Sequence, residues 1–328
     1  MTAEALPRVS ICLLTYNRAQ ILPATLDSLL AQSHGDFELI INDDRSPDNT
    51  EDICRDYMRR DSRIRYFKNA VNLRYAGNQN AALLRATSDY VAIVHDGDIY
   101  RPDLIEKWTR SLVEQPTAAL VFNALEVMDE DGRVGCVHRH PYGQLVPGME
   151  LFDDMIRRPD SPIFGIVMVR KPCVFSVGPF DPRISTLADV DMWLRLLLRY
   201  DAAYIAEPLL RVAPREANHH NTLANWNVRG QYELIYALNS ARRYPGHTEK
   251  VVELRRQITP MIWEMRIRAL LDCLRCGRMQ AFGQGLAFIA RRLDFAAAAS
   301  PDTVLDWEGF ALSMRNAEPT SGGPGATV

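Results

Sequence analysis

The sequence lacks both of the glycine-rich loops that most often bind phosphate groups at the start of a helix. No Gly-x-Gly-x-x-Gly follows the first apolar run, and no Gly-x-x-x-x-Gly-Lys-Ser/Thr occurs in the 328 residues. Both loops use backbone N–H groups at a helix N-terminus to bind anions. Any phosphate group that this chain binds therefore needs another source of positive charge, and a divalent metal is the usual one.

Cysteine, net positive charge and long apolar runs are also scarce. Six cysteines in a chain of this length are too few for a disulfide framework and favour a reducing compartment. The net charge of −3 gives no electrostatic reason to expect nucleic-acid binding. No signal sequence precedes Arg8, and no window approaches the roughly 18 apolar residues of a membrane span. We therefore expect a cytoplasmic protein without a transmembrane anchor.

Short apolar runs alternate with helical patterns over the first part of the chain. The expected strands are 8–14, 37–41, 63–67 and 90–94, and the expected helices are 21–30, 51–60, 77–86 and 102–114. Nearly continuous apolar runs are typical of strands that are buried on both faces. Their alternation with helices predicts an α/β fold with an open, mainly parallel, twisted sheet and flanking helices.

The pattern changes after residue 114. Apolar runs at 118–128 and 133–138 flank the turn sequence Asp-Glu-Asp-Gly and predict an antiparallel hairpin. A strand at 165–170, a helix at 189–200 and a strand at 203–206 follow, and the chain from 225 to about 315 is almost entirely helical in pattern. We therefore expect an α/β domain at 1–222, a helical C-terminal region at 223–315 and a disordered tail at 316–328.

Two carboxylates follow the fourth expected strand directly. The apolar run Tyr90–Val94 ends in His95-Asp96-Gly97-Asp98, so the carboxylates lie at the carboxyl edge of the sheet, where open α/β proteins bind ligands. At a spacing of two residues in extended chain, both can face one hard cation that still accepts pyrophosphate oxygens. A solvated turn with two surface aspartates is the alternative.

Other polar clusters follow the first two strands. Thr15 to Arg18 come after the first strand and Asp43 and Asp44 after the second, so the topology brings them to the same edge as Asp96. Asp44 can accept a hydrogen bond from a pyrimidine imide or a ribose hydroxyl, and Tyr16 can lie against the base. These residue types predict a site for a nucleoside diphosphate.

Asp189 begins the helical pattern at 189–200. A carboxylate there can act as an N-cap, or it can take the proton of a sugar hydroxyl as a general base. Asp191 would then stay on the same helix face in support.

Together these motifs resemble the inverting nucleotide-sugar glycosyltransferases of family 2, which have the GT-A fold. The resemblance rests on residues 9–18, 41–50, 72–80, 96–98 and 189–195 and covers about 8–213. It implies a donor site formed by Thr15, Tyr16, Arg18, Asp44, Arg74 and Asp96, with Mn²⁺ or Mg²⁺ at Asp96 and Asp98. It also implies that Asp189 is the catalytic base and that one displacement inverts the anomeric centre.

Two motifs depart from the family pattern. His95 and Gly97 occupy the first and third acidic positions of the common Asp-x-Asp-Asp loop, which leaves open whether Asp96 or Asp98 binds the metal. Ala188 replaces the Glu that usually precedes the base, which removes one carboxylate from the acceptor site. His219 and His220 lie where many members have a histidine near the metal, although surface histidines are the favoured interpretation.

The expected function is transfer of a sugar from a nucleoside diphosphate donor, with UDP the expected nucleotide. The acceptor would be a hydroxyl of a glycan or small molecule in cell-surface glycan or polysaccharide synthesis. A catalytically weak nucleotide-sugar-binding or scaffold subunit is one alternative. A sugar-nucleotide nucleotidyltransferase is another, although it would need a glycine-rich loop that Leu14–Asn17 lacks. The arginine-rich C-terminal helices favour a helical cap or a dimer interface, with peripheral contact at the inner face of an anionic membrane as the alternative.

Overall fold

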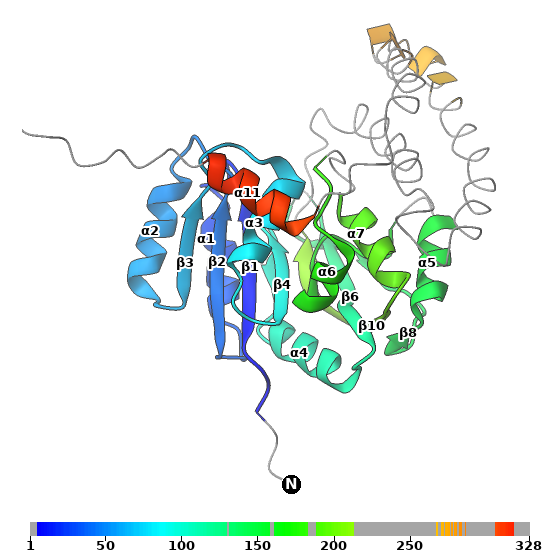
Figure 1. Ribbon diagram of the computed structural model, residues 1–328. Helices are drawn as coiled ribbons and strands as arrows, with labels where there is room; N and C mark the ends of the chain where they lie inside the picture. Colours follow the sequence, from blue (N-terminus) through cyan, green and yellow to red (C-terminus); the bar gives the residue numbers. More distant parts are fainter. Residues whose placement is uncertain are drawn as a thin grey trace, which may run out of the picture.

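The computed structural model describes residues 5–129, 131–157, 161–182, 188–212 and 306–317, together with individual residues between 267 and 286. The described strands form a single sheet in the order β3-β2-β1-β4-β9-β6-β10-β5, with β7 paired to β6 and β8 to β10. Helices cover both faces of this sheet (Figure 1). The predicted α/β class with flanking helices is therefore confirmed.

Four parallel strands form one half of the sheet. They are β1 (Val9–Thr15), β2 (Phe37–Asp43), β3 (Ile64–Lys68) and β4 (Tyr90–His95). Each lies within two residues of its predicted range. The chain enters β1 from below in Figure 1, so the carboxyl ends of these strands form the upper edge of the sheet.

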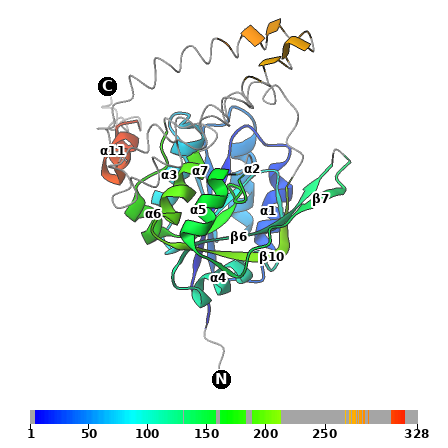
Figure 2. The same cartoon turned by 90° about the vertical axis from the view of Figure 1, so that its right-hand side faces the viewer.

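The other half of the sheet contains the hairpin that the sequence predicts. The hairpin consists of β6 (Ala118–Met128) and β7 (Val134–His138), which pair antiparallel and extend away from the body of the protein in Figure 2. β10 (Asp201–Val212) is longer than predicted and runs parallel to β6. The short strands β5 (Ile99–Tyr100), β8 (Leu145–Val146) and β9 (Val167–Arg170) run antiparallel to their neighbours. As a result β6 and β10 point the same way as the four strands β1 to β4.

Alternate residues of β1 pack against opposite layers of helices. Ile11 and Leu13 face the core under α1 (Leu22–Leu30), α2 (Thr50–Arg60) and α4 (Leu104–Glu114). Cys12 and Leu14 face the core under α3 (Arg74–Arg85), α5 (Gly148–Arg157), α6 (Lys171–Val177) and α7 (Ala188–Leu197). Because both faces are covered, every residue of β1 is buried, as its continuous apolar run predicts.

Four short elements were not predicted from the sequence: β5, β8, α5 and α6. β5 and β8 have only two residues each, too few for an alternating pattern. α3 also begins at Arg74, three residues before its predicted start, with Arg74 at φ 60°. A non-glycine residue at positive φ is a poor helix start by local preference, which explains the late prediction.

The last described helix, α11 (Trp307–Ala317), lies over α3 and α6. The Trp307 ring stacks on Phe175 of α6 at 4.2 Å between centroids, and Figure 1 shows α11 crossing in front of α3. The described residues between 267 and 286 are mainly helical. None of the described helices has the length and apolar composition that crossing a membrane requires.

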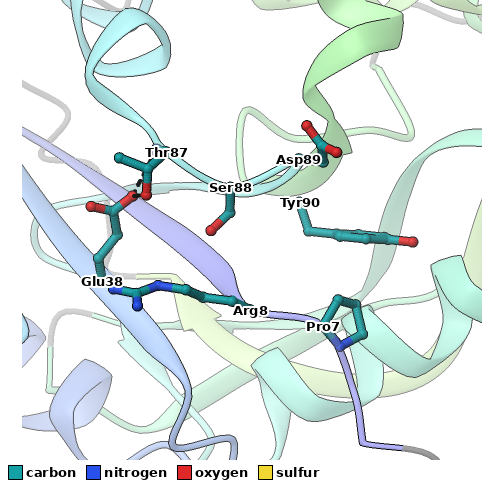
Figure 3. Close-up of a pocket in the computed structure, with 7 residues that line it drawn as sticks. All are labelled: Pro7, Arg8, Glu38, Thr87, Ser88, Asp89 and Tyr90. Atoms are coloured by element: carbon teal, nitrogen blue, oxygen red, sulfur yellow. Dashed lines mark hydrogen bonds between the residues drawn. The ribbon is translucent and has the colours of Figure 1, made fainter.

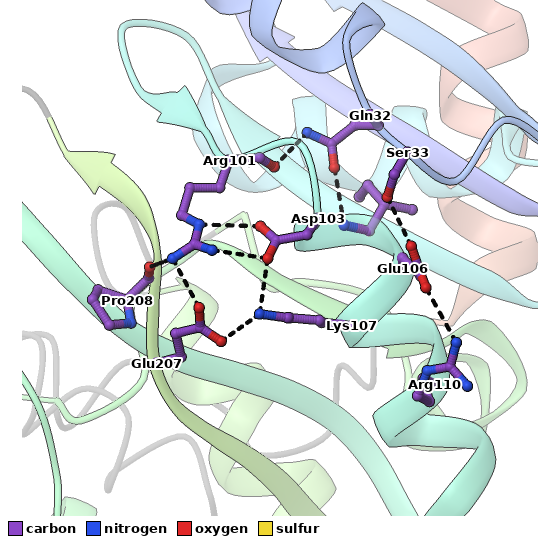
Figure 4. A network of polar contacts seen from close by, with 10 residues as sticks. Gln32, Ser33, Arg101, Asp103, Glu106, Lys107, Arg110, Glu207 and Pro208 are labelled. Atoms are coloured by element: carbon purple, nitrogen blue, oxygen red, sulfur yellow. Dashed lines mark hydrogen bonds and ion pairs between the residues drawn. The ribbon is translucent and has the colours of Figure 1, made fainter.

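A polar network fixes the chain just after the acidic loop. Arg101 forms ion pairs with Asp103 and Glu207, both at 2.9 Å, and Lys107 of α4 contacts the same two carboxylates (Figure 4). Gln32 donates to the Arg101 carbonyl at 2.8 Å, and the backbone N–H of Arg101 donates to the carbonyl of Leu209. The start of α4 is thereby joined to the end of α1 and to β10.

Candidate functional site

The carboxyl ends of β1, β2 and β4 are in register, and hydrogen bonds join the loops that follow them. Thr15 of β1 pairs with Asp43 of β2, and Leu14 pairs with His95 of β4. The Asp44 N–H donates to the Thr15 carbonyl at 3.0 Å, and the Asn17 N–H donates to Ser46 Oγ at 2.8 Å. The predicted convergence of these polar clusters on one sheet edge is therefore present in the structure.

Asp96 lies against the loop after β1. Its Oδ2 accepts the Tyr16 N–H at 3.4 Å, and its Oδ1 lies 3.9 Å from Nε of Arg18. Burial raises the pKa of Asp96, and the Thr15 hydroxyl and the Arg18 guanidinium oppose that shift only in part. Tyr16 is 48% exposed beside this carboxylate, so its ring is available to stack on a base.

A residue with positive φ follows each of the first four strands. Asn17, Arg45 and Arg74 have φ between 56° and 65°, and Gly97 has φ 86°. Left-handed backbone at a non-glycine residue costs free energy and often occurs at ligand-binding sites. Three such residues at one sheet edge therefore support the assignment of the site to this edge.

Gly97 is required by the conformation of the acidic loop. Besides its positive φ, a Cβ at this position would lie 3.0 Å from Cδ1 of Ile21. Thr25 of α1 fixes the same loop, because its Oγ1 accepts the Gly97 N–H and donates to the Asp98 carbonyl, both at 3.0 Å. The glycine that departs from the family pattern thus has a structural cause.

Asp44 is buried at the end of β2 and held by several donors. Its Oδ1 accepts the Leu73 N–H at 2.7 Å and Asn69 Nδ2 at 3.0 Å. Burial raises the pKa of Asp44, with these hydrogen bonds and the Arg74 N–H acting in the opposite direction. Arg74 itself is exposed, and its backbone N–H also lies 3.0 Å from Asn72 Oδ1. Its backbone is therefore placed at the Asp44 carboxylate.

The two predicted metal ligands have different surroundings. Asp96 contacts the loop after β1, whereas Asp98 is only 5% exposed and its charge adds to the burial that raises the pKa of Tyr100. Among the residues that the structure describes, no group of three or more His, Cys, Asp or Glu side chains could bind a metal ion. Two carboxylates nevertheless fit a Mg²⁺ or Mn²⁺ ion that takes its remaining ligands from substrate phosphates.

Asp189, the predicted base, comes close to the end of β4. A Cβ added to Gly165 would lie 2.9 Å from Asp189 Oδ2, 2.8 Å from His95 Cε1 and 2.6 Å from the Tyr75 hydroxyl. Asp189 is the second residue of α7, and its Oδ1 accepts the Val190 N–H at 2.8 Å. Helix α7 therefore places this carboxylate next to the acidic loop, although more than 90 residues separate them in the sequence.

The side chain of Asp191 does not lie where the sequence analysis expects it. Asp191 is fully buried, and its Oδ2 pairs with Arg195 Nη2 at 2.8 Å, so it does not support Asp189 at the acceptor side. A step of two residues is a rotation of about 200° about the helix axis, so Asp189 and Asp191 lie on nearly opposite sides of α7. Ala188, which stands where the family pattern has a Glu, is also fully buried within the apolar core.

One pocket of about 500 Å³ lies at the opposite, amino edge of the sheet (Figure 3). It contains none of the predicted site residues. Its buried carboxylate, Glu38, already accepts hydrogen bonds from Ser10, Thr87 and Arg65. Burial alone would raise the pKa of Glu38, but these bonds outweigh it and lower the pKa to about 2. Glu38 is thus a structural residue, and the pocket gives no reason to move the site.

The prediction of His219 and His220 falls outside the described residues. Three residues around the site were missed from the sequence: Thr25, Tyr75 and Gly165. Tyr75 lies inside the 72–80 motif, which was a usable signal. The sequence gives no such signal for Gly165, because its neighbours in space come from three other segments.

Comparisons with known proteins agree with this fold. The profile of Glycosyl transferase family 2 matches residues 10–163. A protein of Bacillus subtilis (strain 168) named "Putative teichuronic acid biosynthesis glycosyltransferase TuaG" is 30% identical over 201 residues, which cover 60% of this chain and 75% of TuaG.

Solved structures show the same fold. S. aureus TarS 1-349 in complex with UDP-GlcNAc has a TM-score of 0.58 at 16% identity, with 96% of this chain and 93% of that chain covered. The mannosyltransferase PcManGT from Pyrobaculum calidifontis, in complex with GDP-Man and Mn²⁺, has a TM-score of 0.58 at 16% identity, with 95% and 85% covered. These likenesses confirm the fold class that the sequence predicts.

Proposed function

Because the chain belongs to glycosyl transferase family 2, we propose that it transfers a sugar with inversion from a UDP-linked donor to an acceptor hydroxyl. The acceptor in this proposal is a glycan of the cell surface, which the name of TuaG supports. Residues 1–222 would form the catalytic unit on the GT-A fold, and residues 223–315 a helical region beside it.

The donor nucleotide would bind along the carboxyl ends of β1 and β2. Thr15, Tyr16 and Arg18 border this edge from β1, and Asp44 and Arg74 border it from β2 and α3. The Asp44 carboxylate would accept the imide N–H of uracil, which is the hydrogen-bonding feature that distinguishes uracil from cytosine. The exposed ring of Tyr16 would stack on the base, and Arg18 would lie near the diphosphate.

Asp96 and Asp98 would bind the divalent metal, Mn²⁺ or Mg²⁺. When bound, the ion supplies the positive charge that neutralises the diphosphate as it leaves. The Mn²⁺ in the PcManGT structure supports a metal in this family. The sequence also has neither of the glycine-rich loops whose backbone N–H groups would otherwise bind the diphosphate, and this supports a metal as well.

Asp189 would act as the general base. Its carboxylate takes the proton of the acceptor hydroxyl while that oxygen attacks the anomeric carbon of the sugar. The bond from this carbon to the diphosphate oxygen breaks, and the diphosphate leaves with the electron pair. One displacement from the face opposite the leaving group inverts the anomeric centre.

The observation that carries this proposal is the position of Asp189 beside His95, the residue next to Asp96. In a transfer reaction the distance between the base and the diphosphate must be about the length of one sugar, because the sugar lies between them. A binding or scaffold subunit has no need for a carboxylate at that place. A nucleotidyltransferase would require a glycine-rich loop after β1, where the chain has Thr15 to Arg18.

Replacing Asp189 with Asn tests the proposal directly. We expect transfer to fall at least about 100-fold, which is the usual contribution of a general base, with UDP binding in the presence of Mn²⁺ unchanged. The measurements are turnover of a panel of UDP-sugars and calorimetric titration with UDP. Transfer at the wild-type rate in Asp189→Asn would remove this residue from the mechanism.

Chelation tests the metal separately. EDTA is expected to abolish transfer by the wild-type protein, and added Mn²⁺ or Mg²⁺ to restore it. Indifference of the rate to EDTA would show that Asp96 and Asp98 do not act through a metal.

A further inference from the structure

Gly165 lies at a point where side chains from three other elements meet. Tyr75 comes from the first turn of α3, His95 from the end of β4 and Asp189 from the first turn of α7. All three have an atom within 2.9 Å of the position that a Gly165 Cβ would occupy, so no two of these atoms are more than twice that distance apart. The three side chains therefore form one compact cluster.

Gly165 is needed for space rather than for its backbone conformation. Its φ is not among the positive values of the described residues, so an L-residue could adopt the backbone. A methyl group, however, would come closer than 3.0 Å to all three side chains, a distance that real Cβ atoms do not show. The absence of a side chain at 165 is what allows Tyr75, His95 and Asp189 to approach one another.

Tyr75 and His95 are held as a pair. The Tyr75 hydroxyl lies 3.3 Å from His95 Nε2, and the two rings meet edge to face with centroids 5.7 Å apart. The backbone of His95 is fixed by the Tyr100 hydroxyl, which accepts its N–H at 3.0 Å and donates to its carbonyl at 2.9 Å. Such a pair keeps its polar atoms in a defined place.

The cluster opens to solvent while its base is closed. Gly165 is buried, whereas Tyr75, His95 and Asp189 are partly exposed. Gly165 therefore lies beneath three side chains that solvent or a ligand can reach in part. Asp96 is the next residue along the chain from His95.

We propose that Tyr75 and His95 position the transferred sugar of the donor against Asp189, in a cluster whose close packing requires a glycine at 165. This inference rests on the proposed function, because the sugar must lie between the diphosphate at Asp96 and the base. A hydroxyl and an imidazole can each donate or accept hydrogen bonds, which suits sugar hydroxyls. Both groups can also do so without adding a negative charge next to the diphosphate.

Two variants test the inference: Tyr75→Phe removes the hydroxyl, and His95→Gln removes the imidazole. In both we expect UDP with Mn²⁺ to bind as in the wild type. Affinity for the preferred UDP-sugar is expected to fall about tenfold, as for one neutral hydrogen bond. The selectivity among UDP-glucose, UDP-galactose and UDP-N-acetylglucosamine is expected to narrow as well. The matched control is Tyr90→Phe, which removes a hydroxyl at the other end of β4, where it accepts from Arg170 at 2.8 Å.

Gly165→Ala tests whether the cluster requires a glycine at 165. We expect it to reduce transfer and UDP-sugar affinity at least tenfold while UDP affinity is kept. The control is Gly35→Ala, whose Cβ would have nothing within 4 Å and should leave both affinities unchanged.

The outcomes separate this inference from the proposed function. If the wild type transfers sugar and Tyr75→Phe and His95→Gln keep its UDP-sugar affinity, selectivity and rate, the inference is wrong and the proposed function stands. If UDP and UDP-sugar affinities fall together in both variants, the pair supports the nucleotide loop and the inference is again wrong. If the wild type binds no nucleotide or nucleotide sugar, the proposed function and the inference fail together.

Discussion

The buried ion pair between Asp191 and Arg195 allows a sharp test of which carboxylate on α7 is catalytic. Asp191 is fully buried and Arg195 is 3% exposed, and their closest atoms are 2.8 Å apart. Arg195 also donates to the carbonyls of Val177, Gly178 and Pro179. The pair therefore joins α7 to the chain that follows α6. We predict that Asp191→Asn destabilises the fold without removing the chemistry.

The magnitude follows from what the substitution leaves behind. The Asn side chain keeps the shape of Asp191 but removes its charge, so the guanidinium of Arg195 stays buried without a counter-ion. Removing one partner of a buried pair costs about 3 to 5 kcal/mol. For a unit of roughly 200 residues, that cost lowers Tm by about 6 to 15 °C. The three carbonyls still accept from Arg195, so we expect the lower part of this range.

Asp189→Asn is the matched control, because it makes the same chemical change two residues earlier on the same helix. Asp189 is partly exposed, and substitutions at such positions usually change stability little, so the change should move Tm by less than about 2 °C. The two variants should therefore give crossed results. Asp191→Asn loses stability and keeps turnover per folded molecule, and Asp189→Asn keeps stability and loses turnover.

Thermal unfolding by circular dichroism, together with turnover measured well below the lower Tm, gives both quantities. If Asp191→Asn keeps the wild-type Tm and loses turnover, Asp191 acts in catalysis and the structural assignment is wrong. If Asp189→Asn unfolds as readily as Asp191→Asn, the first turn of α7 depends on Asp189, and its loss of activity would not identify a base.

Three further predictions concern the loops and the amino edge. Gly97→Asp should lower stability by about 1 to 2 kcal/mol in thermal unfolding because of its positive φ, without raising Mn²⁺ affinity, and an unchanged Tm would contradict this. Glu38 has its pKa lowered to about 2, so its stabilisation is present above about pH 4.5 and lost as pH falls toward 2. Glu38→Gln should therefore cost about 2 to 3 kcal/mol at neutral pH and remove that acid-induced loss, which urea unfolding at several pH values would show or refute. Burial raises the pKa of Asp44, so UDP affinity should fall as this carboxylate is protonated on acidification, and calorimetry should find that fall absent in Asp44→Asn.

The parallel half of the sheet was predictable because its physical cause is local. A strand covered on both faces is apolar at consecutive positions, so β1, β2 and β4 are visible as short apolar runs in the sequence. Their order along the chain, with a helix between each pair, then places the carboxyl ends at one edge. Tyr16, Asp44 and Asp96 could be assigned to one site on that basis alone.

The orientation of α7 could not be predicted in the same way. Nine of its ten residues, all except Asp189, are buried, so apolar periodicity does not distinguish the face toward the core from the face toward the site. The spacing of Asp191 and Arg195 by four residues was the available signal for an ion pair. Gly165 could not be found at all, because the need for a glycine there is created by side chains from α3, β4 and α7.

The conformation of the acidic loop is compatible with the proposed metal site, even though a glycine occupies its third position. A left-handed residue at Gly97 turns the backbone between Asp96 and Asp98, and Thr25 fixes that turn from α1. The two carboxylates consequently differ in their surroundings, with Asp96 next to Tyr16 and Arg18, and Asp98 buried near Tyr100. A metal bound here would meet the diphosphate through the Asp96 side, because that is the side shared with the nucleotide loop. His95 then extends the same edge toward Asp189, so one strand end would serve the nucleotide, the metal and the sugar in sequence order.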